Sequence, residues 1–353
     1  MHELFLNAIV FGAMVGALAL AMPAGRRRGA VALVLALIGT ITGLVMGVLV
    51  PSDLWRLPMD TGLGGVIALT LGQAALAMVA VAAGRPWLPG PAFIVAPLTG
   101  ALLGEIGGAV LLAGTTEDRG ARARLALGAA AGGFLGRMAD PGMLLLGPEG
   151  LGSLRFAPLV LVALPAARPR AGDLAGRADG DKAVTAIGLG AAVATMIPGF
   201  ELVAVTLGVV SLGGLAVVRR RQDRGGHLDA TPLAWAAGAA ILVLVATAAG
   251  TPAVIGLGIE EVQNAFMAWG PAAMFGAGAL VSALAGGHGA ALLAQAVLDR
   301  TLALNVPDAA AALAMGVSVG GLGPLLAVGA LRAGWTRWLL QVVLVGAVGL
   351  WLL

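Results

Sequence analysis

Long apolar stretches alternate with short charged turns along most of this chain. Three early stretches are each long enough to cross a hydrocarbon core of about 30 Å, which takes roughly 20 helical residues: Leu4–Met22, Gly29–Val50 and Gly62–Ala83. A segment interrupted by proline and glycine follows at 89–114, then a charged loop at 116–124 and another apolar span at 125–147. This order predicts three membrane helices, a re-entrant helical hairpin and one further span.

The second half of the chain repeats this order. It predicts three spans, a hairpin, an interrupted span and a last helix, at Ala183–Ile197, Leu202–Val218, Leu233–Gly250, Pro271–Val297, Ala309–Leu331 and Trp335–Leu353. In the first half the matching last helix, Phe156–Ala166, is too short to cross a membrane alone. It either continues from residues near Gly152 or is half of a broken pair, and both readings stay open.

A twelve-residue stretch occurs twice, as LALGAAAGGFLG at 125–136 and as LAMGVSVGGLGP at 313–324. Each copy contains a glycine pair inside an apolar span, Gly132-Gly133 in the first and Gly320-Gly321 in the second. Irregular backbone at membrane depth is tolerated only beside a cavity or within buried protein. We therefore expect each pair to interrupt its helix, and paired interrupted helices point to the substrate site of a transporter.

The expected fold is an all-α polytopic membrane protein built as an inverted repeat. Each half has three helices, a re-entrant hairpin, a broken helix and a final helix. The first repeat covers 1–167 and the second covers 183–353, with a charged, glycine-rich cytoplasmic linker at 168–182.

Composition supports a membrane protein and excludes several classes of function. Hydrophobic residues make up 59% of the chain and charged residues 11%, whereas soluble domains carry about 25% charged residues. The mean hydropathy is +0.98. There is no cysteine, which excludes disulfides and thiol chemistry, and no nucleotide, hydrolase or paired-histidine metal motif is present, so we expect neither an enzyme nor a cofactor. The net charge of +3 comes from arginines at helix ends, a topology signal rather than a nucleic-acid surface.

The basic clusters predict the orientation, because arginine and lysine in short loops stay on the cytoplasmic side. The clusters expected inside are Arg26–Arg28, Arg119–Arg124, Arg168–Lys182, Arg219–Arg224 and Arg332 with Arg337. They can share one side if the hairpin enters and leaves from the cytoplasm. Both termini are then outside, the second half is inverted, and the expected location is a bacterial inner membrane.

Ionisable residues within apolar spans are functional candidates, because each costs several kcal/mol at bilayer depth. Glu105 lies deep in the first hairpin and is followed by a Gly-Gly that would end a half-helix. Its alternative role is to cap backbone amides at a wet hairpin tip. Arg137 and Asp140 follow the first glycine pair, and Pro141 disfavours helix at Asp140. Asp140 with Glu105 would suit a transient cation site, or Asp140 and Arg137 could form a structural ion pair.

The second half supplies matching candidates. His288 lies at the tip of the second hairpin, and histidine titrates in the range that proton-coupled transporters use. It is either a proton carrier or a hydrogen-bonded interior group. Ser318, Gly320 and Gly321 would contribute hydroxyl and backbone groups where the second broken helix opens, as Gly132 and Gly133 do in the first.

These motifs resemble those of the ion-transporter superfamily that includes NhaD-type sodium/proton antiporters, arsenite permeases and sodium-coupled carboxylate symporters. The run 129–140, AAAGGFLGRMAD, is similar to the first broken helix of NhaD-like proteins, and 315–324 to the second. The resemblance places Asp140 at the family's aspartate and implies a homodimer. Where the family's hairpin tips present Asp-Asn, this chain has Gly104-Glu105 and 285–288, AGGH.

The sequence thus favours a secondary transporter that exchanges a small cation, with sodium first, for protons by alternating access. Its site would lie at the bilayer midplane between two hairpins and two broken helices. Two alternatives stay open. One is transport of a carboxylate or oxyanion with Arg137 and His288 as positive partners, and the other is a non-transporting membrane scaffold that has lost the site.

Overall fold

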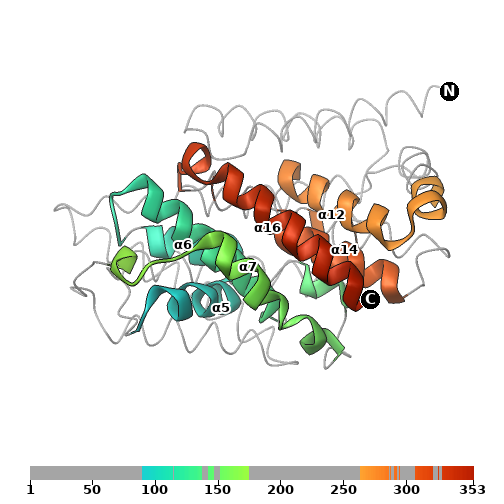
Figure 1. Cartoon of the computed structure of the whole chain (residues 1–353), viewed down its shortest axis with the longest axis horizontal. Helices are drawn as coiled ribbons and strands as arrows, with labels where there is room; N and C mark the ends of the chain where they lie inside the picture. Colours follow the sequence, from blue (N-terminus) through green and yellow to red (C-terminus); the bar gives the residue numbers. More distant parts are fainter. Residues whose placement is uncertain are drawn as a thin grey trace, which may run out of the picture.

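The computed structural model describes residues 90–113, 115–136, 142–146, 152–174, 263–285, 307–320 and 328–353, together with residues 287, 290, 291, 294 and 325. These are the coloured segments of Figure 1. The six predicted spans at 4–22, 29–50, 62–83, 183–197, 202–218 and 233–250 lie outside the described residues, as does most of the linker. The site candidates Arg137, Asp140, His288 and Gly321 also lie outside them.

All regular structure within the described residues is helical, in agreement with the expected all-α class. The α-helices are α5 (Ala92–Ala113), α6 (Arg119–Ala131), α7 (Leu159–Ala167), α12 (Pro271–Ala285), α14 (Pro307–Gly320) and α16 (Leu331–Leu352). Four 3-10 turns join them, η1 (Gly132–Phe134), η2 (Met143–Leu146), η3 (Gly152–Phe156) and η4 (Ala171–Leu174). In Figure 1, α16 runs diagonally across the molecule, between α6 and α7 on one side and α12 and α14 on the other.

The predicted first hairpin is present as a chain that folds back within α5. Gly104 breaks the helix with φ 75 and ψ 168, a conformation that only glycine adopts without strain. A Cβ on Gly108 would lie 2.9 Å from the Gly100 Cα, although eight residues of continuous helix rise by about 12 Å. The position of the break corrects the sequence prediction. The turn is at Gly104, before Glu105, and Gly107-Gly108 remain helical because the fold uses Gly108 for close packing.

The first glycine pair ends its α-helix, as predicted. After Ala131 the chain tightens into η1, where the Leu135 N–H donates to the Gly132 carbonyl oxygen at 2.9 Å. α6 has 13 residues and is about 20 Å long, which is shorter than a hydrocarbon core of about 30 Å. α14 has 14 residues and ends at Gly320, the first glycine of the second pair.

Two helices begin at residues other than those predicted from the sequence. The last helix of the first half, α7, is preceded by η3, and turns at Ala157 and Pro158 connect the two. The chain from Gly152 is helical but changes from a 3-10 helix to an α-helix across these turns, so both readings stay open. The last helix of the chain, α16, begins at Leu331 instead of Trp335.

Two helix pairs pack backbone against backbone through glycine. Between α5 and α6, a Cβ on Gly100 would lie 1.8 Å from the Ala129 carbonyl oxygen. Between α12 and α14, a Cβ on Gly278 would lie 2.6 Å from the Leu313 carbonyl oxygen. No side chain fits at either position, so the helices approach as closely as small-residue membrane contacts allow.

The equivalent contacts define a register for the internal repeat. Gly132 lies against the carbonyl oxygen of Pro97 and the nitrogen of Ala101, and Gly316 lies in the same way against Phe275 and Ala279. The structure therefore matches Gly132 with Gly316, one helical turn before the Gly320 that the sequence repeat aligns with it. Two glycines stand four residues apart in each copy, Gly128 and Gly132 in the first and Gly316 and Gly320 in the second. The same packing contact can therefore form one helical turn earlier or later.

α16 joins the two pairs. The buried Gln341 donates from Nε2 to the carbonyl oxygens of Leu127 on α6 and Ala163 on α7, at 3.3 and 3.4 Å. Gly346 of the same helix packs against the Phe275 ring of α12. Of the helices that the structure describes, α16 alone is long and apolar enough to cross a membrane, and 22% of its most apolar window is buried.

We predict that Gly278→Ala destabilises the protein and that Gly276→Ala, on the same helix, does not. The added methyl group at residue 278 would overlap the Leu313 carbonyl, and such overpacking costs about 1–3 kcal/mol. At residue 276 nothing lies within 4 Å, and alanine favours helix. Thermal unfolding of the purified protein in detergent checks this. Equal midpoints for the two variants would contradict the close α12–α14 contact.

Candidate functional site

Among the described residues, Glu105 has an ionisable side chain that is fully buried, with 0% of its surface exposed. Its Oε1 accepts a hydrogen bond from the Gly287 N–H at 3.1 Å. Glu105 directly follows the break in α5, and Gly287 lies just beyond the end of α12, in the predicted tip of the second hairpin. Glu105 in α5 and the backbone just after α12 therefore lie in direct contact.

The local fold explains why the carboxylate is there. The break at Gly104 makes Glu105 the first residue of the second half of α5, where the N–H groups of a helix start point toward negative charge. Gly132 packs against Ala101, in the part of α5 that precedes the break. The end of α6 and the first part of α5 are thus held together.

A second contact between the halves involves Ser318. A Cβ on Gly142 would lie 2.0 Å from the Ser318 Oγ and 2.2 Å from the Ala314 carbonyl oxygen. Ser318 is fully buried on α14. Gly142, which follows the first glycine pair, therefore lies directly against α14. The predicted role of the Ser318 hydroxyl at an ion site stays a prediction.

The end of α14 is less open than the sequence suggests. The last four carbonyl groups of a helix lack partners within it, and we expected such groups to be available to a cation. Two of them already accept hydrogen bonds, Val317 from the Ser282 hydroxyl at 2.8 Å and Val319 from the Trp338 indole at 3.2 Å. Side chains from neighbouring helices thus stabilise this buried end.

The predicted site residues divide into two groups. Within the described residues, Glu105, Gly132, Gly133, Ser318 and Gly320 are all buried, on or directly after elements that pack together. Arg137, Asp140, His288 and Gly321 lie outside these residues, so the Arg137–Asp140 ion pair and the His288 proton carrier stay predictions. No group of three histidine or acidic side chains in the described part could hold a metal ion.

Sequence analysis missed three side chains that hold the site's surroundings together: Ser282, Trp338 and Gln341. Each is a polar or amphipathic residue within an apolar run. That signal was present, because a polar group buried in such a run requires a partner. The partners themselves lie 19 to 214 residues away along the chain.

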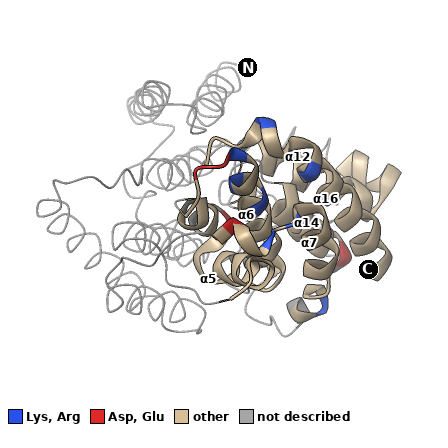
Figure 2. Ribbon diagram, turned by 60° about the vertical axis from the view of Figure 1, so that its left-hand side comes forward, with Lys and Arg blue, Asp and Glu red and all other residues tan. Residues whose placement is uncertain are grey.

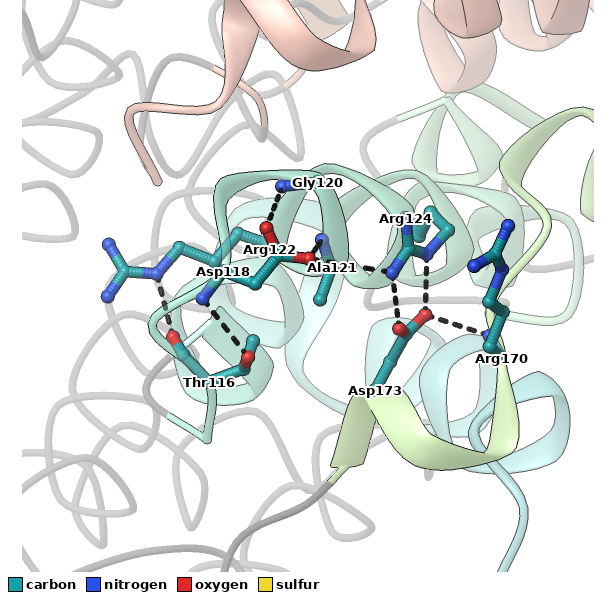
Figure 3. A network of polar contacts seen from close by, with 8 residues as sticks. All are labelled: Thr116, Asp118, Gly120, Ala121, Arg122, Arg124, Arg170 and Asp173. Carbon is teal, nitrogen blue, oxygen red and sulfur yellow. Dashed lines mark hydrogen bonds and ion pairs between the residues drawn. The ribbon is translucent and has the colours of Figure 1, made fainter.

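A second polar cluster lies around the start of α6 (Figure 3). We call it the arginine corner; its charged residues are Asp118, Arg124, Arg168, Arg170, Asp173 and Arg337. Arg124 forms a bidentate pair with Asp173, Nε to Oδ2 at 2.7 Å and Nη2 to Oδ1 at 2.5 Å, with side-chain exposures of 11% and 5%. The Arg170 N–H also donates to Asp173 at 2.8 Å. Burial raises the pKa of Asp173, but these hydrogen bonds and the positive charges outweigh it and leave the pKa below its usual value.

Asp118 caps α6 and accepts hydrogen bonds from the backbone N–H groups of Gly120 and Ala121, at 3.1 and 2.9 Å. These bonds lower the pKa of Asp118. Its side chain is 66% exposed. The cap explains why the helix begins at Arg119, directly after the charged loop.

The arginine corner contains residues from three of the five predicted basic clusters. Arg124, Arg168 and Arg170 are electrostatic neighbours of Arg337 at the start of α16. Blue segments gather around α6 in Figure 2, while most of α12 and α14 is tan. The shared location agrees with the expectation that these clusters lie on one side, and which side of a membrane that is stays a prediction.

Comparison with known protein families, with curated proteins and with solved structures finds no match for this chain.

We predict that Asp173→Asn lowers the free energy of unfolding by about 1–3 kcal/mol at neutral pH, because it leaves the part-buried Arg124 without its carboxylate. The stabilisation comes from a lowered pKa, so it is present above the unfolded value of 3.8 and is lost as the pH falls through the folded value. The difference between the two proteins should therefore shrink below about pH 4.

Asp118→Asn is the matched control, because asparagine caps a helix about as well as aspartate. Unfolding midpoints of both variants at several pH values check the prediction. A constant difference between wild type and Asp173→Asn down to low pH would contradict it.

Proposed function

We propose that this chain is a secondary active transporter that exchanges a small cation for protons across a bacterial inner membrane, with the Glu105 carboxyl at its site. The observation that carries the proposal is the contact between Glu105, at the break in α5, and Gly287, in the predicted tip of the second hairpin. A fully buried carboxylate of one half accepts a hydrogen bond from the backbone of the other.

The apolar outer surface of the described helices supports membrane placement. On α16 the side chains of Trp335, Leu339 and Val343 follow one another at every fourth residue and are 52%, 47% and 58% exposed. An exposed apolar stripe of this kind suits lipid rather than water. Trp335 and Trp351 are exposed near opposite ends of α16, as in an aromatic belt.

The chemistry of Glu105 supports coupling to protons or a cation. Moving a carboxylate from water into low-dielectric surroundings costs free energy, which hydrogen bonds and positive partners offset. A carboxyl in this position is stabilised by a proton or by a bound cation, and the two exclude each other when they compete for the same oxygens. Such competition is the basis of exchange.

The arrangement of the short helices supports alternating access. α6 and α14 end inside the protein, and each packs against a neighbour of its own half. Glu105 with Gly287, and Gly142 with Ser318, connect one half to the other. If the halves rock against each other, these are the contacts that change, and the site they enclose opens to one side at a time.

A carboxylate at the hairpin contact favours a cation over an anion as the transported ion, because carboxylate and hydroxyl oxygens are ligands for hard cations. The anion alternative depends on Arg137 and His288. The scaffold alternative requires that Glu105 serve only as a cap for the Gly287 amide.

We predict that Glu105→Gln abolishes cation-driven proton movement while leaving the fold intact. Glutamine keeps the oxygen that accepts from Gly287 and removes the titrating charge. Proteoliposomes with an internal pH dye, challenged with sodium, lithium or potassium gradients, should show at least about a tenfold loss of rate, in line with removal of a proton-transferring group.

Glu117→Gln is the matched control, because Glu117 is exposed in the loop before α6. Wild-type rates in Glu105→Gln would contradict the proposal. Uptake driven by a carboxylate or oxyanion, and lost in Arg137→Gln, would favour the anion transporter. A folded wild-type protein that moves none of these ions would favour the scaffold.

A further inference from the structure

The described part of the arginine corner contains more positively charged than negatively charged side chains. Four guanidinium groups, from Arg124, Arg168, Arg170 and Arg337, are set against the carboxylates of Asp173 and Asp118. The pair with Arg124 occupies Asp173, and Asp118 caps the backbone of α6. Among the described residues, the corner is therefore a local excess of positive charge between apolar helices.

Two of these guanidinium groups have N–H donors without a hydrogen-bond partner among the described residues. Nη1 of Arg337 is buried and has no hydrogen-bond partner among the described residues. Arg170 contacts Asp173 through its backbone N–H only, and Figure 3 shows its guanidinium extending beyond the carboxylate, on the side where Arg124 lies. The two groups come from α16 and from the turn after α7, and they are electrostatic neighbours.

The backbone at Arg168 is a further sign of a built site. Arg168 ends α7 in the left-handed conformation, with φ 49 and ψ 50. It is the one residue other than glycine with a positive φ in the described part of the chain. Glycine is the usual residue at this position of a helix end, so an arginine here accepts strain and adds a cation to the corner.

We infer that the arginine corner binds a phosphate group, and that the group belongs to the head of an anionic phospholipid. Guanidinium groups bind phosphate oxygens through paired hydrogen bonds. Basic pockets between membrane helices on the cytoplasmic side hold lipid head groups in this way. Leu340, one turn after Arg337 on α16, is 47% exposed and would lie along the acyl chains. The lipid site is separate from Glu105 and does not depend on transport.

Binding to the full-length protein in a neutral detergent tests the inference. The probes are phosphatidylglycerol, phosphatidylcholine and inorganic phosphate, each followed by native mass spectrometry and by the thermal unfolding midpoint. We expect phosphatidylglycerol to bind and to raise the midpoint, and phosphatidylcholine to do neither. Arg337→Gln and Arg170→Gln should each weaken phosphatidylglycerol binding by about fivefold, the usual contribution of one arginine near an anionic lipid.

Arg155→Gln is the matched control, because Arg155 is an exposed arginine in η3, before the opposite end of α7. Arg170 is exposed, so its variant keeps the inference testable if Arg337→Gln does not fold. Binding of inorganic phosphate that is lost in the same two variants would support the phosphate site and assign it to a soluble ligand. Equal phosphatidylglycerol binding in wild type and both variants, or an equal loss in Arg155→Gln, would overturn it.

Discussion

The described part of this protein depends on glycine backbones that touch carbonyl groups of the neighbouring helix. At Gly100, Gly132, Gly278 and Gly316 a Cβ would lie between 1.8 and 2.6 Å from a backbone oxygen. In lipid, apolar side chains gain little by associating, so helices pair where close approach maximises van der Waals contact. The two resulting pairs, α5 with α6 and α12 with α14, are the units from which the candidate site is built.

Close packing of short helices has a consequence for polar groups. Helices that stop inside the protein leave carbonyl and N–H groups in surroundings without bulk water, and each needs a partner. Ser282 and Trp338 supply partners to two carbonyls at the end of α14, and the Gly287 N–H supplies one to Glu105 after the break in α5. Most of these bonds connect different helices, so the groups that make the breaks tolerable also hold the helices together.

The same constraint connects structure with function. A break inside the protein brings an ionisable group to depth without exposing it, and Glu105 is the described example. At the opposite extreme, the arginine corner leaves charge near the surface, where Arg124 and Asp173 fasten α6 to the turn after α7. An ion pair thus fastens this end of α6, while the described contacts between the halves include the Glu105–Gly287 hydrogen bond and the packing of Gly142 on α14.

The sequence by itself determined the helical class, the fold-back within 89–114, the end of α6 at the first glycine pair and the burial of Glu105. These follow from local properties: apolar length, the conformational freedom of glycine, and the rarity of carboxylates in apolar runs. Only the tertiary structure decided that the break precedes Glu105, that Gly132 corresponds to Gly316 instead of Gly320, and that Glu105 meets Gly287. Contacts between residues 182 positions apart depend on which face of each helix is turned to its neighbour. With glycine and alanine at almost every turn of α6, α12 and α14, several faces have nearly the same apolar pattern, so only packing in three dimensions distinguishes them.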